Sequence, residues 1–164
     1  MQTVSSMRAL ILVDGFHTEG LMAALTRVLS LDSAELLLLY VQGPGPRAGL
    51  DLVRRRPGGH RLPPLREREL AQAELEGSAN ALAEAEKLAH PLSNNVESIQ
   101  VTGEPGRAVC DVASRQGVDL IVIRAGSRDQ PRVGPGSLGP TARFVADHRP
   151  CPVLLLRGVR NPRP

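Results

Sequence analysis

Four short apolar runs are almost uninterrupted by polar residues, and they restrict the fold more than any other feature of this sequence. They lie at 9–13, 36–41, 120–123 and 153–156, and a weaker run lies at 96–101. A strand that is apolar along its whole length is covered on both faces, as strands in parallel sheets are. The runs therefore predict five strands of a parallel sheet.

Helical patterns lie between these runs, with apolar residues three and four positions apart. They span 18–30, 65–89, 105–116 and 140–148. Strands and helices thus alternate, which predicts parallel strands joined by right-handed crossovers in a doubly wound α/β sandwich. Ligands of such folds bind beyond the carboxyl ends of the strands, where the strand order reverses, so we expect any site to follow those ends.

The length of 164 residues fits one domain. We predict that this domain spans 8–158, after a disordered lead-in at 1–7 and before a tail at 159–164. Residues 43–64 interrupt the pattern, because they hold five glycines, five prolines and five arginines. Such a segment cannot pack as a core element, and we expect a mobile loop. Its arginines could attract an anionic ligand or a partner, although a solvated loop is the favoured interpretation.

Lysine is nearly absent from the chain, since Lys87 stands alone among 20 basic residues. A Walker-type phosphate loop is therefore excluded, because it requires a lysine on the terminal phosphates. Three aromatic residues are too few for a single-stranded nucleic-acid platform, and a net charge of +3 does not by itself indicate a nucleic-acid partner. No apolar run has the length of a membrane span, and the first residues lack a signal-peptide pattern. We expect a cytoplasmic protein with no nucleic-acid or membrane partner.

Residues that usually carry catalysis or hold metals are scattered in this sequence. Cys110 and Cys151 are far apart, and we expect reduced, buried thiols. No histidine stands at metal-ligand spacing from another histidine, a cysteine or a carboxylate. The sequence also lacks a G-x-S-x-G nucleophile elbow. We therefore expect neither a metal nor a catalytic residue.

Asp14 directly follows the first predicted strand. A carboxylate at the carboxyl end of a strand can accept hydrogen bonds from ribose hydroxyls or from an adenine amine. It can equally cap the helix that follows, a role for which Thr18 competes. Both interpretations of Asp14 stay open.

Glycines gather before the last predicted helix, where 134–139 spell G-x-G-x-x-G. A dinucleotide-binding fingerprint has this spelling but follows the first strand, so we reject a dehydrogenase. The helix that begins at 140 still offers free backbone amides and the positive end of its dipole. Gly126 and Ser127 leave the fourth strand at the same end of the sheet. An anion-binding loop is the functional interpretation, and an ordinary long loop is the alternative.

Three arginines accompany this segment, namely Arg128, Arg132 and Arg143. Because a guanidinium matches the geometry of phosphate oxygens, they are candidate anion-binding groups.

The stretches at 9–15, 35–41, 101–105, 117–123 and 149–156 together resemble the universal stress protein domain, and the resemblance covers about 8–157. It implies an adenine-nucleotide α-hydrolase-like, Rossmann-like fold with five parallel strands in the order 3-2-1-4-5. It also implies a homodimer formed through the last strand, here 153–156.

Some members of this family bind ATP and others do not. In the binders, the resemblance implies that Asp14 and Val41, with Val13 beside them, contact the ribose and the adenine. A G-x2-G-x9-G-[ST] motif would hold the phosphates.

The first half of that motif is altered in this chain. Counted from the fourth strand, its two glycines fall on Arg124 and Ser127, whereas another register places them on Gly126 and Asp129. Arg124 would add bulk where the backbone must approach a phosphate closely, and Asp129 would add like charge.

The second half of the motif is altered as well. Its third glycine falls on Gly139, but the Ser/Thr position is Pro140, which lacks both an amide donor and a hydroxyl. Thr141 could substitute for the hydroxyl. Phe16 stands where many members carry a small hydroxyl residue, and we expect it to narrow the pocket.

We therefore expect a non-enzymatic module of the universal stress type with lost or altered ATP binding. It would act through an unknown protein partner or an unusual anionic ligand. The alternative is a true binder of ATP with magnesium, or of another adenine nucleotide, with at most slow ATP hydrolysis; an oxidoreductase with a flavin or nicotinamide cofactor is a distant third. The candidate contacts of the alternative are Val13, Asp14, Val41, Gly126, Ser127, Gly139 and Thr141.

Overall fold

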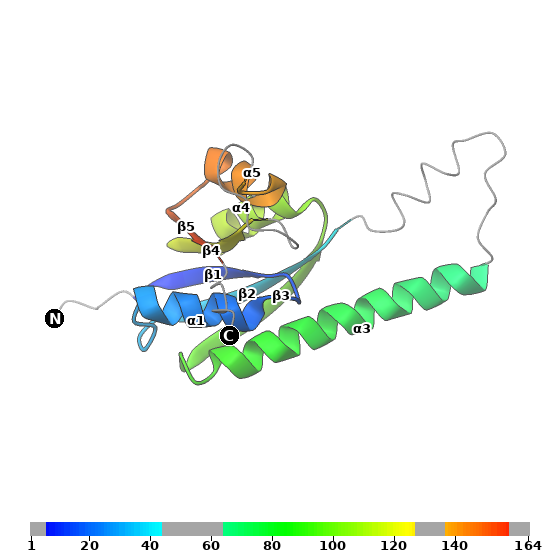
Figure 1. The fold of residues 1–164 in the computed structure, drawn as a ribbon, viewed down its shortest axis with the longest axis horizontal. Helices are drawn as coiled ribbons and strands as arrows, with labels where there is room; N and C mark the ends of the chain where they lie inside the picture. Colours follow the sequence, from blue (N-terminus) through cyan, green and yellow to red (C-terminus); the bar gives the residue numbers. More distant parts are fainter. Residues whose placement is uncertain (1–5, 44–63, 127–136, 158–164) are drawn as a thin grey trace, which may run out of the picture.

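The structure is a computed structural model that describes residues 6–43, 64–126 and 137–157. A five-stranded sheet forms its centre, with the strand order β3-β2-β1-β4-β5 (Figure 1). Each neighbouring pair of strands is parallel. The predicted fold class and strand order are confirmed. The strands are β1 (Arg8–Val13), β2 (Glu35–Gln42), β3 (Asn95–Thr102), β4 (Leu120–Ala125) and β5 (Val153–Arg157).

Four helices cover the two faces of the sheet in the described residues. Helices α1 (Thr18–Val28) and α3 (Pro64–Ala89) lie on one face, and α4 (Pro105–Arg115) and α5 (Pro140–His148) lie on the other (Figure 1). Helix α1 ends two residues earlier than expected, because Leu29 already has an extended backbone.

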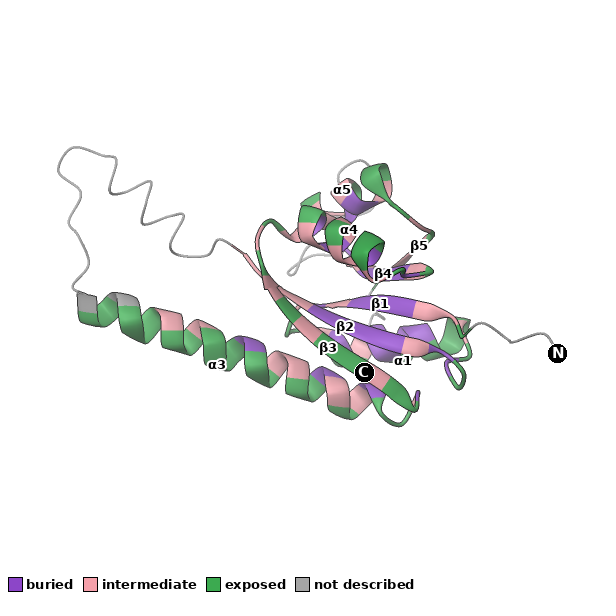
Figure 2. Cartoon of the chain, turned by 180° about the vertical axis from the view of Figure 1, so that it is seen from behind, coloured by how far each residue is buried: buried purple, intermediate pink, exposed green. Residues whose placement is uncertain are grey.

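Two apolar layers form the core, one on each side of the sheet. Because successive strand residues point to opposite faces, Ile11 and Leu38 pack toward α1 and α3, whereas Leu10 and Leu37 pack toward α4 and α5. Figure 2 shows that burial concentrates in β1 and β2, while β3 at the sheet edge is largely exposed. The continuous apolar runs at 9–13, 36–41 and 120–123 thus form strands with both faces largely covered, whereas the run at 153–156 forms the partly buried edge strand β5.

The start of α4 follows the sequence signals expected of it. Glu104 caps the helix, since its carboxylate accepts hydrogen bonds from the backbone N–H groups of Gly106 and Arg107, and Pro105 occupies the first turn. Helix α5 packs closely on this turn, because a Cβ atom at Gly106 would lie 2.7 Å from the ring of Phe144. The first turn of α4 therefore packs against the middle of α5.

Several sequence expectations fall on residues outside the described part of the chain. They include most of the lead-in, most of the 43–64 loop and the tail, together with Ser127, Arg128, Asp129 and Arg132. They stay predictions. No helix in the described ranges combines the length and apolar character needed to cross a membrane.

Candidate functional site

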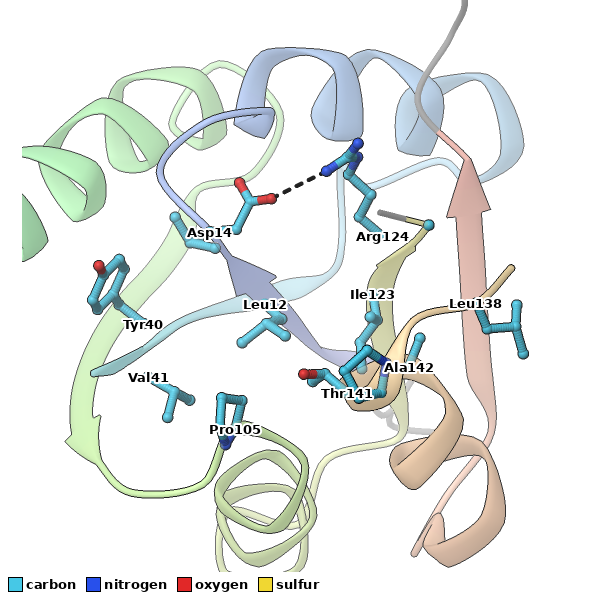
Figure 3. A pocket seen from close by; sticks show the side chains of 13 residues that line it. Leu12, Asp14, Tyr40, Val41, Pro105, Ile123, Arg124, Leu138, Thr141 and Ala142 are labelled. Carbon is cyan, nitrogen blue, oxygen red and sulfur yellow. Dashed lines mark hydrogen bonds and ion pairs between the residues drawn. The ribbon is translucent and has the colours of Figure 1, made fainter. Parts of the chain in front are cut away.

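A cavity of about 230 Å³ opens at the carboxyl ends of β1, β2 and β4 (Figure 3). It lies where the strand order reverses between β1 and β4, the position expected for a ligand site in this architecture. Much of its wall is apolar, and the polar groups come from few residues. The apolar wall includes Leu12, Val13, Val41, Ile123, Leu138 and Ala142.

Asp14 is held at this edge by the backbone that follows it. Its Oδ1 accepts hydrogen bonds from the backbone N–H groups of Phe16, at 2.9 Å, and His17, at 3.0 Å. Burial raises the pKa of Asp14, but these two hydrogen bonds, together with the charges of His17 and Arg124, outweigh it and lower the pKa below the usual 3.8. Asp14 is therefore ionised at neutral pH, and it orders the turn before α1, whose N-cap His17 makes no side-chain capping bond.

Arg124 lies opposite Asp14 at the end of β4 (Figure 3). Its Nη1 is 3.5 Å from Oδ2 of Asp14, and the two side chains are 16% and 31% exposed. Its Nε is buried and has no hydrogen-bond partner in the structure described here. The cavity thus contains an ion pair in which the cation has an unused donor.

The two ends of the glycine-rich loop meet at the cavity. The N–H of Gly126 donates to the carbonyl of Leu138 at 3.1 Å, and a Cβ atom at Gly139 would lie 3.5 Å from the carbonyl oxygen of Gly126. Gly126 and Gly139 have φ angles of 119° and 78°, in the range that favours glycine. The backbone conformation at both positions therefore favours glycine, although the space around them would accept a Cβ atom.

The N-termini of α4 and α5 border the same cavity. Pro105 of α4 and Pro140, Thr141 and Ala142 of α5 line it. Gly139 precedes α5 as its N-cap and offers no side-chain capping bond. Because first-turn amides lack intrahelical partners, the N-terminus of α5 favours a negative charge in front of it, whereas two first-turn amides of α4 already donate to the carboxylate of Glu104.

Five of the seven residues proposed from the sequence line this one cavity: Val13, Asp14, Val41, Gly126 and Thr141. Gly139 lies beside Gly126, and Ser127 is outside the described residues.

Two further sequence expectations are not reproduced in the cavity wall. Phe16 does not line the cavity and is 68% exposed, so the expected narrowing by Phe16 is not found, whereas Arg124 is part of the wall. Arg143, one of the candidate anion-binding arginines, is exposed on α5 and is absent from the wall as well.

Sequence reasoning missed the partnership of Arg124 with Asp14, and it did not assign Tyr40 and Pro105 to the wall. The sequence signal that could have indicated this contact is the expected pairing of the first and fourth strands. Neighbouring parallel strands end at the same edge of the sheet, so the residues that follow them lie close together. The register pairs Ile11 with Val122, so both chain segments reach the edge together. Neither this register nor the direction of the Arg124 side chain can be derived from the sequence.

The two cysteines lie away from the cavity, in the layer between the sheet and α4. Cys110 and Cys151 are free and partly buried rather than fully buried as expected. Burial raises the pKa of both thiols, with nearby Asp111 acting in the same direction on Cys110 and Asp119 on Cys151. Within the described ranges, histidines, cysteines and carboxylates form no group of three suited to a metal ion.

Known structures share this architecture over nearly the whole chain. The universal stress protein UspA from Lactobacillus plantarum is 26% identical, with a TM-score of 0.64 over 92% of this chain and 97% of that one. A universal stress family protein from Arabidopsis thaliana, solved with AMP bound, is 18% identical, with a TM-score of 0.63 over 96% and 95% of the two chains. A universal stress protein in complex with cAMP is 18% identical, with a TM-score of 0.52 over 92% and 95%. Among curated proteins, none is similar enough to count as a match.

The sequence itself matches the model of the universal stress protein family across residues 7–157. The matched segment includes all five strands, all four described helices and every described wall residue of the cavity. This chain belongs to the universal stress protein family.

Proposed function

We propose that this chain is a non-enzymatic module of the stress response in which ATP binding is lost or altered. The observation that carries the proposal is the ion pair between Arg124 and Asp14 inside the cavity. Asp14 already accepts two backbone hydrogen bonds on Oδ1, and Oδ2 faces a guanidinium. A ribose or an adenine would have to compete with these donors for the carboxylate.

The size of the cavity supports the same proposal. Its volume of about 230 Å³ is below the range of roughly 300–1,000 Å³ in which drug-sized ligands are usually held. Arg124 is part of the wall, and one of the two registers of the family motif places a glycine at its position. A ligand smaller than ATP fits these dimensions better.

Binding of an adenine nucleotide remains the second candidate, because a specific arrangement favours it. Val13, Asp14, Val41, Gly126 and Thr141 surround one cavity, bordered by two helix N-termini. Two proteins of similar fold were solved with AMP and with cAMP. Both ligands carry a single phosphate, which is consistent with a small site.

Thermal unfolding with and without ATP and magnesium separates the two candidates. If ATP binds and its concentration is 100 times the dissociation constant, binding adds about 2.7 kcal/mol to the free energy of unfolding. We expect no rise in melting temperature at millimolar ATP, with magnesium chloride alone as the control. A clear rise that is lost in Asp14→Ala, but kept in the exposed control Asp111→Ala, would instead establish the ATP binder.

We also propose that the chain forms a homodimer through β5. This strand is at the edge of the sheet, so no strand of the described residues lies on its outer side, and Val153, Leu154 and Leu155 are only partly buried. Exposed apolar edges commonly pair with another chain. Sedimentation at micromolar concentration is expected to give twice the 17.6 kDa mass of one chain. A monomer mass across a concentration series contradicts this proposal.

A further inference from the structure

The guanidinium of Arg124 has hydrogen-bonding capacity that the described residues do not use. Its Nε is buried and unpartnered, and its Nη1 makes one contact of 3.5 Å, to Oδ2 of Asp14. Buried polar groups in folded proteins almost always have a partner, and a charged donor is the least favourable one to leave unpaired. An acceptor for this donor is therefore expected from outside the described chain.

The position of the unused donor indicates what that acceptor is. In any arginine, the Nε–H and one N–H of Nη2 point in the same direction and together bind two oxygens of a carboxylate or a phosphate. Nη1, which faces Asp14, lies on the other side of the guanidinium. The edge of the guanidinium formed by Nε and Nη2 thus has no hydrogen-bond partner at Nε among the described residues, but it is covered in this conformation.

The contact with Asp14 is loose enough to be exchanged. A charge-assisted N–H···O bond is usually about 2.7–2.9 Å long, and this one is 3.5 Å. Because Arg124 is 16% exposed and its Nε is covered, the guanidinium has to turn away from Asp14 to meet a ligand. That turn gives up a contact longer than a usual charge-assisted hydrogen bond, and the oxyanion replaces Asp14 as the partner.

The surroundings limit the ligand to one anionic group. Among the described residues in the cavity wall, Asp14 and Arg124 carry opposite charges that cancel. One oxyanion takes the place of Asp14 beside Arg124 and is favoured by the positive dipole end of α5, whose first residues line the cavity. Every further negative charge would meet the carboxylate of Asp14, and the described wall holds no cation besides Arg124. Such repulsion is how a site rejects a competing ligand.

The remaining wall fits the uncharged part of a compact ligand. Leu12, Val41 and Ile123 supply an apolar surface, and the phenol of Tyr40 and the hydroxyl of Thr141 stand at its margin (Figure 3). A small number of polar groups on an apolar wall is the usual composition of a small-molecule site.

We propose that Arg124 makes this cavity a receptor for a compact ligand with a single phosphate or carboxylate group, and that it selects against a triphosphate. The inference deepens the proposed function and rests on it. It assigns to Arg124 the role of the specificity-determining residue.

Titration calorimetry on the full chain tests the inference with five probes: AMP, adenosine, inorganic phosphate, benzoate, and ATP with magnesium. We expect AMP or benzoate to bind more tightly than ATP, and adenosine to bind more weakly than AMP. Preference for AMP identifies a phosphate ester as the ligand group, and preference for benzoate identifies a carboxylate.

Three variants assign the binding to Arg124. Arg124→Gln is expected to lower the affinity for the probe that binds most tightly by about 10- to 100-fold, since a hydrogen-bonded charge is lost. Arg124→Lys keeps the charge but loses the side-on edge, and intermediate affinity is expected. Arg115→Gln removes an exposed arginine at the far end of α4 and should change nothing. Far-UV circular dichroism checks that each variant is folded. If Arg124→Gln does not fold, Arg124→Lys still tests the role of Arg124.

Two results would overturn the inference. One is the absence of binding by AMP, phosphate and benzoate at millimolar concentration, which leaves the proposed loss of ATP binding intact. The other is unchanged affinity in both Arg124 variants. Tight ATP binding that is independent of Arg124 would instead contradict the proposed function itself.

Discussion

Replacement of Leu38 by alanine is expected to lower the free energy of unfolding by about 2–5 kcal/mol. Leu38 lies in the middle of β2, is 0% exposed, and packs in the layer between the sheet and helices α1 and α3. It is paired in register with Ile11 of the central strand β1. Its truncation removes buried methyl groups and leaves a cavity that the packed strands cannot fully close. Urea denaturation monitored by circular dichroism measures the change.

Leu75→Ala is the matched control, because it makes the same chemical change on the surface. Leu75 lies on α3 and is 52% exposed. We expect a change within about 0.5 kcal/mol, as for most surface substitutions. If the two variants were equally stable, the layer that contains Leu38 would not be the core of the fold.

The same burial explains why the fold could be predicted from the sequence. A strand covered on both faces must be apolar at consecutive positions, and the runs at 9–13 and 36–41 are the buried centres of β1 and β2. The edge strand β3 gave a weaker signal because its side chains are mostly exposed. Proline at the first turns of α4 and α5 marked the starts of those helices in the sequence.

The location of the cavity followed from the same logic, but its content did not. Asp14 and Val41 were expected at one edge, because parallel strands end together. The partnership of Asp14 with Arg124 joins residues 110 positions apart. It depends on strand register and on side-chain direction, which a single sequence does not encode locally. The sequence therefore indicated that Arg124 adds bulk, but not that it neutralises the carboxylate.

The largest effect expected within the cavity belongs to Asp14→Asn. The amide keeps an oxygen that can accept from the N–H groups of Phe16 and His17, but it carries no charge opposite Arg124. The loss of a charged partner for a largely buried donor costs about 1–3 kcal/mol. Since Asp14 is 31% exposed and solvent screens the pair, we expect a value near the lower end at pH 7, measured by urea denaturation.

Two further variants attribute this loss to the ion pair. Asp111→Asn makes the same change on an exposed position of α4 and is expected to stay within about 0.5 kcal/mol of the wild type. The double variant Asp14→Asn with Arg124→Gln removes both charges. It should be less destabilised than the sum of the two single variants, because neither charge is then left without its partner.

The pH dependence of the Asp14→Asn effect follows from the lowered pKa of the carboxyl group. Burial raises this pKa, but the backbone hydrogen bonds and the charges of His17 and Arg124 outweigh it, so the folded state holds the proton less tightly than the unfolded chain. The charge of Asp14 therefore stabilises the fold fully above the unfolded pKa of about 3.9, and this stability is lost as the pH falls through the lower folded value. The difference between wild type and Asp14→Asn should be constant from about pH 7 to pH 5 and should shrink below about pH 4. A difference that grows in acid would mean that the carboxyl group is stabilised in its neutral form, and it would contradict an ion pair between Asp14 and Arg124 in the folded state.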